Sequence, residues 1–329
     1  MTELPATRAA ELRNALLIHN PSAGSSGVRR RRQLDEARRI FAASGIEAEL
    51  AETKGPGDAT AIAQQAIVER RELVIACGGD GTLNEVVNGL ASWRTPGETR
   101  VPLALLPAGT ANVFAKEMEL PWDIPRAAYK LARGKVYEIA LGLATPLLEP
   151  EKKKYFLSVA GAGPDGMIVY SVGVSLKTRL GIFAYWWQGL TLIFGYKFPR
   201  FQVVNGKHRA DASLVIVGRT KHYGGPFKIT TLANLFEDQF EIMTVDSQSG
   251  LRYLSYLPPL WLGRLRGISG VRFSKTEAVT CEPLDDAPVH AQVDGEPLGR
   301  LPVEFKIVPR ALKIIVPPRT QAIRRDGTA

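Results

Sequence analysis

The sequence has few of the residues that build disulfides and metal centres. Among its 329 residues are two cysteines, Cys77 and Cys281, and four histidines. The cysteines form no Cys-x-x-Cys pair and the histidines show no metal-ligand spacing, which argues against a disulfide framework and a zinc site. Such sparse cysteine is typical of a reducing compartment, so we expect the protein in the cytoplasm.

The sequence also lacks several familiar signals. Residues 1–13 contain no apolar run of the kind that a secretory signal peptide carries, so we expect none. No Gly-x-x-x-x-Gly-Lys-Ser/Thr sequence is present, which excludes a P-loop nucleotide site. Gly161-Ala-Gly-Pro-Asp-Gly166 matches the glycine pattern of dinucleotide-binding domains, but no acidic residue follows at the distance needed to bind a ribose. We therefore interpret that stretch as a turn after a strand.

Acidic residues are absent over a long internal stretch. Residues 166–210 contain no Asp or Glu, while Lys177, Arg179 and Lys197 are among six basic residues there. The uncharged, aromatic-rich middle, 180–196, would extend about 26 Å as a helix. Its three glycines and one glutamine argue against a membrane span. We expect this segment to contact lipid or a membrane surface, with packing in the core as the alternative.

The overall charge is strongly positive. The chain has 42 Lys and Arg against 33 Asp and Glu, a net charge of +9. Such a charge favours nucleic acid or an anionic membrane surface as partner. No RNA-binding signature, recognition helix or zinc-ligand spacing accompanies it, so we expect no nucleic-acid partner but peripheral contact with an anionic membrane. A basic but unspecialised surface is the alternative.

The length predicts two domains. Strands and helices alternate up to about residue 140, which predicts a parallel α/β sheet with ligands at the carboxyl ends of its strands. Beyond it, short strands between Gly- and Pro-rich turns predict a β-sandwich or barrel. We place an α/β domain at 1–140, a β-rich domain at 141–310, and a last strand and tail at 311–329.

In the first domain we expect strands at 16–19, 46–52, 72–76 and 101–105 and helices at 28–44, 59–70 and after Asp80, with Asp58 as an N-cap. In the second we expect strands at 155–160, 200–204, 212–219, 227–231, 240–245 and 271–274, and a last strand at 311–316.

One stretch, 76–89, has the pattern of a strand, a glycine loop and a helix: Ala-Cys-Gly-Gly-Asp-Gly-Thr-Leu-Asn-Glu-Val-Val-Asn-Gly. The glycines allow close approach of a phosphate to backbone N–H groups, and a helix start adds further donors. Asp80 would repel a phosphate, so it needs a bridging cation or a hydroxyl proton. The pattern favours nucleotide and Mg²⁺ chemistry, and a tight turn with an aspartate cap is the alternative.

Five sequences in register resemble the catalytic domain of the diacylglycerol kinase family, which includes bacterial lipid kinases and the sphingosine and ceramide kinases. They are Asn20-Pro-Ser-Ala-Gly24, Gly78-Gly-Asp-Gly-Thr-Leu-Asn-Glu85, Leu106-Pro-Ala-Gly-Thr-Ala-Asn-Val-Phe-Ala115, Tyr155-Phe-Leu-Ser-Val-Ala-Gly-Ala-Gly163 and Asp294-Gly-Glu296. The likeness extends over about residues 14–316. Gly-Gly-Asp-Gly-Thr alone would be weak, because NAD kinases share it.

The resemblance implies an N-terminal parallel α/β ATP-binding domain and a C-terminal β-sandwich domain that carries the lipid substrate, as in NAD kinases and diacylglycerol kinases, with the last strand returning to the first domain. It implies an ATP-dependent lipid kinase that transfers the γ-phosphoryl group to a lipid hydroxyl such as that of diacylglycerol or a sphingoid base, with ATP and Mg²⁺ as cofactors. The expected ATP-binding residues are Asn20, Thr53, Gly78, Gly79, Asp80, Gly81, Thr82, Asn84, Glu85, Gly109, Thr110 and Asn112.

The resemblance also assigns catalytic roles. Such a kinase needs a carboxylate to accept the hydroxyl proton and others to hold Mg²⁺. We assign Glu296 as the proton acceptor and Asp294 as the next candidate for that role. We assign Asp80 to the metal or the hydroxyl, with Asp238 as a further metal candidate. In isolation, Asp294-Gly-Glu296 would be a surface turn.

The sequence departs from the family in ways that put its metal binding in question. Val113 and Ala140 stand where many members have aspartate, and Asp238 is followed by glutamine where glycine is common near a structural metal. Two alternatives therefore remain: an NAD kinase, or a nucleotide- or lipid-binding protein whose kinase activity has decayed. Leu83-Asn-Glu85 and Gly109-Thr-Ala-Asn112 argue against the first alternative. Intact Asp80 and Glu296 argue against the second.

Overall fold

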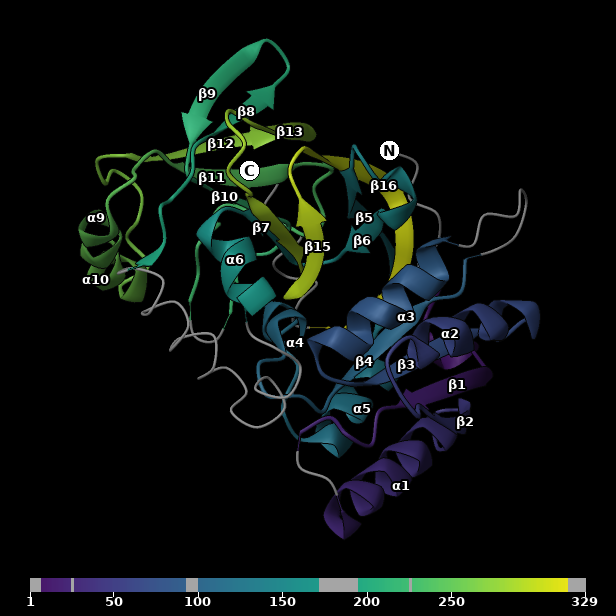
Figure 1. The fold of residues 1–329 in the computed structure, drawn as a ribbon. Coiled ribbons are helices and arrows are strands. Elements are labelled where there is room, and N and C mark those ends of the chain that lie inside the picture. Colours follow the sequence, from purple (N-terminus) through teal and green to yellow (C-terminus); the bar gives the residue numbers. More distant parts are fainter. Residues whose placement is uncertain (1–6, 25–26, 93–99, 172–194, 225–226, 319–329) are drawn as a thin grey trace. The chain divides into compact units, whose positions relative to one another are not determined.

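The computed structural model describes residues 7–24, 27–92, 100–171, 195–224 and 227–318 (Figure 1). The chain divides into two compact units. The first comprises Met1–Ala140 and Arg310–Ala329, and the second comprises Leu141–Pro309. The expected lipid-contacting segment 180–196 and the basic residues Lys177 and Arg179 lie largely outside the described residues.

The first unit is a parallel sheet with helices on both faces. Strands β2-β1-β3-β4 lie side by side in that order, and α1 packs with α5 while α2 packs with α3 (Figure 1). The order reverses between β1 and β3, and ligands bind at such a switch point, outside the carboxyl ends of the strands. The elements are η1 (Ala9–Glu11), β1 (Asn14–His19), α1 (Val28–Ala42), β2 (Glu47–Glu52), α2 (Asp58–Val68), β3 (Leu73–Gly78), α3 (Asp80–Ser92), β4 (Leu103–Pro107), α4 (Val113–Glu117) and α5 (Ile124–Ala132).

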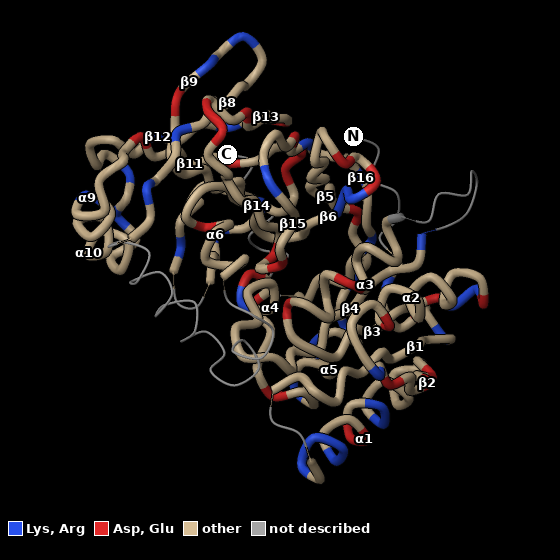
Figure 2. The backbone as a smooth tube through the Cα atoms, viewed as in Figure 1, with Lys and Arg blue, Asp and Glu red and all other residues tan. Residues whose placement is uncertain are grey.

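Local sequence explains these elements. All six residues of β3 are buried, as expected for a strand with neighbours on both sides and helices on both faces. Helix α5 starts where Asp123 accepts a hydrogen bond from the Arg126 N–H at 3.0 Å, with Pro125 in its first turn. The arginine run at 29–32 lies at the start of α1, where Lys and Arg gather (Figure 2).

The second unit is a β-sandwich. One antiparallel sheet has the order β12-β11-β10-β7-β14-β15, and β13, β8, β9, β6 and parts of β5 and β16 form the other layer. Between them, Phe156 stacks on Phe240 at 5.6 Å between ring centroids and meets the edge of Phe305 at 6.3 Å. The elements are β5 (Lys135–Pro146), η2 (Pro150–Lys152), β6 (Lys154–Phe156), β7 (Val159–Ala162), α6 (Pro164–Ser171), β8 (Phe201–Asn205), β9 (His208–Ala212), β10 (Leu214–Gly218), β11 (Phe240–Val245), α9 (Gly250–Ser255), α10 (Leu257–Trp261), β12 (Val271–Thr276), β13 (Ala278–Pro283), β14 (His290–Val293), β15 (Glu296–Arg300) and β16 (Val303–Val316).

This architecture confirms the predicted fold class, an α/β domain with a parallel sheet followed by an antiparallel β-sandwich. Strand β16 belongs to both units. Its first part pairs with β13, and Ile314 near its end pairs with Leu103 of β4.

Three local expectations were wrong. The strand expected at 155–160 is broken into β6 and β7, because the Asp294 carboxylate takes the N–H groups of Leu157 and Ser158. No named strand forms at 227–231, where side chains bind the backbone instead; the Thr230 hydroxyl donates to the Thr220 carbonyl at 2.7 Å. Asp58 is not an N-cap, because its carboxylate accepts N–H groups upstream, from Lys54 and Gly55, while Gly57 occupies the cap position.

Candidate functional site

Two glycine loops of the first unit touch each other. Gly79 follows β3 and Gly109 follows β4, two neighbouring parallel strands. A Cβ added to Gly109 would lie 2.4 Å from the Gly79 Cα, and one added to Gly79 would lie 3.2 Å from the Gly109 Cα. No side chain fits at the first of these positions without a shift. The structure thus brings together the first and second nucleotide motifs that the sequence singled out.

Asp80 stands at the start of α3, directly beside this contact. Its carboxylate accepts the N–H of Val113, the first residue of α4, at 2.8 Å. Val113 therefore ties the two motifs together through its backbone, although its side chain replaces a common aspartate. The residue before it, Asn112, is buried and left-handed, and its amide bonds both the N–H and the carbonyl of Gly109.

Lys116 on α4 was missed in the sequence. Burial lowers the pKa of this half-buried ammonium, and the negative charge of Asp80 opposes that shift. A lysine so close to a glycine loop can bind a phosphate. The only sequence signal for Lys116 was its position four residues after Asn112, which places it one helical turn further along.

The first motif contributes through Asn20 and Gly24, which follow β1. The Asn20 amide donates to the Thr82 hydroxyl on α3 at 3.0 Å. Gly24 is left-handed, and an added Cβ would lie 2.2 Å from the Ala108 carbonyl. Arg30 of α1 donates to the same carbonyl at 3.3 Å, which brings a second cation toward the glycine loops.

The other expected ATP-binding residues differ in their surroundings. Glu85 accepts the Ala59 N–H at the start of α2, and the Asn84 side chain is buried and bonded to Asn88. Thr53 is buried at the end of β2, while Thr110 is exposed between Gly109 and Asn112. Glu85 and Asn84 thus brace α3 against α2 and against its own next turn.

In the second unit, Asp294 and Gly295 form the two-residue turn between β14 and β15. Both residues are left-handed, with φ of 47° and 79°, as the Asp-Gly hairpin turn requires. The Asp294 carboxylate accepts three backbone N–H groups, from Leu157, Ser158 and Val159, at 2.8–3.0 Å. This leaves Glu296, half-buried at the start of β15, as the carboxylate next to a fixed turn.

A metal ion fits the first unit better than it fits the loop around Asp238. Mg²⁺ is usually held by one or two carboxylates together with substrate phosphates, which suits Asp80 beside a phosphate site. In residues 235–239, the buried Arg219 guanidinium donates to the carbonyls of Leu235, Glu237 and Gln239. That fixed positive charge disfavours a cation at Asp238. No group of three or more His, Cys, Asp or Glu side chains that could hold a metal occurs within the described ranges.

The remaining candidates are structural. Cys77 and Cys281 are free and buried, and burial raises the pKa of both thiols, so neither has the properties of a nucleophile. His290 is buried on β14 and stacks on Tyr170, with 4.3 Å between ring centroids. Among the described helices, none is long and apolar enough to cross a membrane.

Comparison with known families matches both units. A model of the diacylglycerol kinase catalytic domain matches residues 14–144. A model of the YegS C-terminal NAD kinase beta sandwich-like domain matches residues 158–316. These matches confirm the resemblance inferred from the five motifs.

Whole-chain relatives agree. A diacylglycerol kinase of Bacillus subtilis (strain 168) is 28% identical over 309 residues, which cover 93% of this chain and 97% of that protein. One of Staphylococcus aureus (strain bovine RF122 / ET3-1) is 29% identical over 308 residues, with 93% of both chains covered. The solved structure of a proposed diacylglycerol kinase from Bacillus anthracis str. Sterne has the same fold, with a TM-score of 0.75 at 24% identity over 94% of this chain and 98% of the other.

Proposed function

Since this chain belongs to the diacylglycerol kinase family and is a lipid kinase, we propose that it transfers the γ-phosphoryl group of ATP to the hydroxyl of diacylglycerol. The observation that carries the proposal is the contact between Gly79 and Gly109 beside Asp80. Two loops of bare backbone at the carboxyl ends of neighbouring strands suit a phosphate chain. A sphingoid base or another lipid alcohol is the alternative acceptor.

In this mechanism the first unit binds ATP. Backbone N–H groups of the glycine loops and the start of α3 hold the phosphates, with Lys116 as a neighbouring cation. Asn20, Thr53, Gly78, Gly81, Thr82 and Thr110 complete or support the ATP site. Asp80 and the nucleotide phosphates together would hold Mg²⁺, which neutralises charge on the phosphates during transfer.

The second unit supplies the proton acceptor. Glu296 accepts the proton of the lipid hydroxyl as the oxygen attacks the γ-phosphorus and the bond to ADP breaks. Asp294 supports the turn rather than the reaction, because its two oxygens already accept three N–H groups.

One experiment tests the substrate class. Purified protein is incubated with radiolabelled ATP, Mg²⁺ and a total lipid extract, and the products are separated by chromatography. We expect label in phosphatidic acid. Label in a phosphorylated sphingoid base would change the acceptor, and label in NADP from added NAD would favour an NAD kinase.

We predict that Gly79→Val weakens ATP binding about tenfold or more. A valine Cβ there would lie 3.2 Å from the Gly109 Cα, and its methyl groups would occupy space that a phosphate needs. Calorimetric titration with ATP and Mg²⁺ measures the change. Ala43→Val, which adds a larger side chain at an exposed position after α1, serves as the control. Equal ATP affinity of the two variants would remove the glycine loop from the site.

We also propose peripheral contact with an anionic membrane through the α9–α10 surface. This surface comprises three apolar side chains that are 67–74% exposed, Leu251, Trp261 and Leu262, and the neighbouring Arg264. Residues 247–276 include no Asp or Glu. An exposed tryptophan with leucines and basic residues is typical of a membrane interface.

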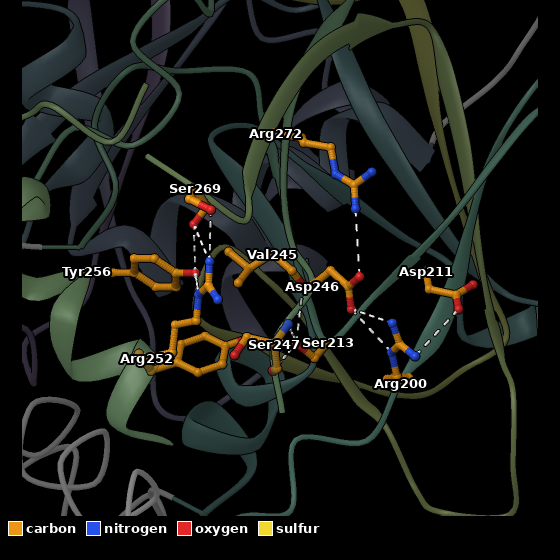
Figure 3. Close-up of polar contacts among 11 residues, drawn as sticks. Arg200, Asp211, Ser213, Val245, Asp246, Ser247, Arg252, Tyr256, Ser269 and Arg272 are labelled. Atoms are coloured by element: carbon orange, nitrogen blue, oxygen red, sulfur yellow. Dashed lines mark hydrogen bonds and ion pairs between the residues drawn. The ribbon is translucent and has the colours of Figure 1, made fainter. Parts of the chain in front are cut away.

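The α9–α10 surface is held on the sandwich. Arg252 donates to the Tyr256 hydroxyl at 3.1 Å and to Ser269 at 3.0 Å, so α9 is tied to the loop before β12 (Figure 3). Four residues before α9, Asp246 pairs with Arg200 at 2.8 Å and with Arg272 at 3.8 Å (Figure 3). A surface fixed in this way presents its apolar side chains without a large ordering cost.

Lys197 is exposed next to Phe198, whose ring stacks on Tyr253 of α9. We predict that Lys197→Gln with Arg264→Gln weakens binding to phosphatidylglycerol-containing vesicles on the order of tenfold. Each basic residue near such a surface contributes about 1 kcal/mol, and high salt should have a similar effect. Trp261→Ser with Leu262→Ser should weaken binding at every salt concentration. The control is Val68→Ser, which removes an apolar side chain that is 57% exposed in the first unit. If all variants sediment with vesicles like wild type, the α9–α10 surface is not the contact.

A further inference from the structure

The turn that carries Glu296 is held by a buried chain of polar side chains from three separate segments. We propose that Asp165 is a positioning residue, which acts through Gln292 to fix the Gly295 N–H and with it the start of β15, where Glu296 lies. The proposal rests on the proposed function, because it takes Glu296 as the proton acceptor.

Gln292 uses both ends of its amide. It lies on β14 with 3% of its surface exposed. Its Nε2 donates to Asp165 Oδ2 at 2.7 Å, and its Oε1 accepts the Gly295 N–H at 2.8 Å. A rotation of the amide by 180° would point a donor at the Gly295 N–H and leave both groups unsatisfied.

Asp165 decides which way that amide points. It is the second residue of α6, it is buried, and its other oxygen bonds the Tyr223 hydroxyl. Burial raises the pKa of this carboxyl, while the hydrogen bonds from Tyr223 and Gln292 oppose the rise. If the Asp165 carboxyl binds a proton, that proton lies on Oδ1, the oxygen that faces Tyr223. Oδ2 therefore accepts from Gln292 whether Asp165 is ionised or neutral.

Close packing keeps this chain of contacts rigid. Helix α6 lies against β14 (Figure 2), and a Cβ on Gly166 would come within 2.1 Å of the His290 carbonyl. A Cβ on Gly161 would come within 2.0 Å of Asp165 Oδ2. The glycines of the stretch that resembled a dinucleotide motif therefore admit the Asp165 side chain and α6.

The turn thus has two independent attachments. The carboxylate of Asp294 is fixed to the link between β6 and β7 and to the first residue of β7, and the N–H of Gly295 is fixed through Gln292 to α6. A general base must keep its geometry to within a fraction of an ångström, and a displacement of about 1 Å can cost on the order of 10²-fold in rate. Two attachments on one two-residue turn serve that requirement.

The test exchanges the carboxylic acid of Asp165 and the amide of Gln292 between their two positions. Gln292→Glu sets two carboxyl groups against each other, and at alkaline pH, where the pair cannot keep a shared proton, we expect kcat for lipid phosphorylation to fall about 10–100-fold with KM for ATP within twofold of wild type. Asp165→Asn should keep most activity, because its amide oxygen can still accept from Gln292. In the double variant, the new asparagine donates to one oxygen of the new glutamate and the other oxygen accepts the Gly295 N–H. We expect its kcat to return to within about threefold of Asp165→Asn.

A second variant distinguishes the loss of the two hydrogen bonds from misfolding caused by the buried charge of Gln292→Glu. Gln292→Met keeps the size, adds no charge and removes both hydrogen bonds, so it should lose kcat without rescue by Asp165→Asn. Gln202→Glu, the same change on a half-buried strand residue bonded to Arg209, is the control and should stay within twofold of wild type. A double variant no more active than Gln292→Glu, or Gln292→Glu and Gln292→Met proteins with wild-type kcat, would overturn the proposal. Glu296→Gln assayed in parallel separates the cases: if it stays active, the assignment of the base has failed, whatever the exchange shows.

Discussion

Replacement of Glu296 by glutamine should lower the rate of lipid phosphorylation by about 10²–10⁴-fold, which is the usual contribution of a general base. Glutamine keeps the size and reach of the side chain but cannot accept a proton at neutral pH. ATP affinity should be nearly unchanged, because the glycine loops and Lys116 that we assign to ATP belong to the other unit. The deciding measurement is the rate at saturating ATP with the protein's own lipid.

The control for this experiment is Glu304→Gln, which makes the same change of charge on β16 of the same unit. It should retain wild-type activity. A Glu296→Gln protein within threefold of wild type would remove Glu296 from the mechanism and transfer the base role to Asp80. Asp80→Asn should also impair the reaction and change its Mg²⁺ requirement, since Asp80 is the carboxylate that we place beside the phosphates.

Replacement of Arg219 by methionine should lower the free energy of unfolding by about 3–5 kcal/mol. The guanidinium is fully buried and donates to the Leu235 carbonyl at 2.7 Å, to Gln239 at 3.2 Å and to Glu237. Methionine fills similar space but leaves three carbonyls without these donors, and a buried unsatisfied polar group costs about 1–3 kcal/mol. Urea denaturation followed by fluorescence measures the loss.

Arg272→Met is the matched control for Arg219→Met. Its guanidinium pairs with Asp246 at 3.8 Å on the surface, and such exposed pairs contribute at most about 1 kcal/mol (Figure 3). Equal unfolding free energies of the two variants would show that the loop at 235–239 does not depend on Arg219. If added Mg²⁺ restored the stability of Arg219→Met, a cation could replace the guanidinium there.

Local sequence was enough to predict the fold class, and the resemblance to the diacylglycerol kinase family implied that the nucleotide motifs form one site. Three glycines between a buried strand and a helix, and a second glycine after the next strand, indicate loops at one edge of a parallel sheet. The structure shows the two loops in contact, with Gly109 too close to Gly79 for any side chain. Asp294-Gly295 likewise has the composition of a two-residue hairpin turn, which the structure contains.

The features that the sequence did not predict depend on hydrogen bonds between residues that are far apart in the chain. The break after Phe156 follows from a carboxylate at 294, and no local pattern around 155–160 signals it. Asp165 and Gln292 meet only because α6 packs on β14, and Arg219 finds its carbonyls in a loop that follows β10. Hydrophobic periodicity reports which face of an element is buried, but it does not identify the polar partner of a buried side chain.

The division of β16 between the two units has a consequence for synthesis on the ribosome. The first unit lacks the strand next to β4 until Ile314 and its buried neighbours have left the exit tunnel. The strands of the second unit all leave the exit tunnel earlier, because that unit ends at Pro309. Domains generally fold as they emerge, but here the N-terminal unit must wait for a pairing between Leu103 and Ile314, which are far apart in sequence, and this is a slow, high-contact-order step. A chain whose residues have emerged only as far as Pro309 would therefore hold the strands of the sandwich attached to an α/β sheet with an open edge at β4, and an unpaired edge of this kind can pair with another chain.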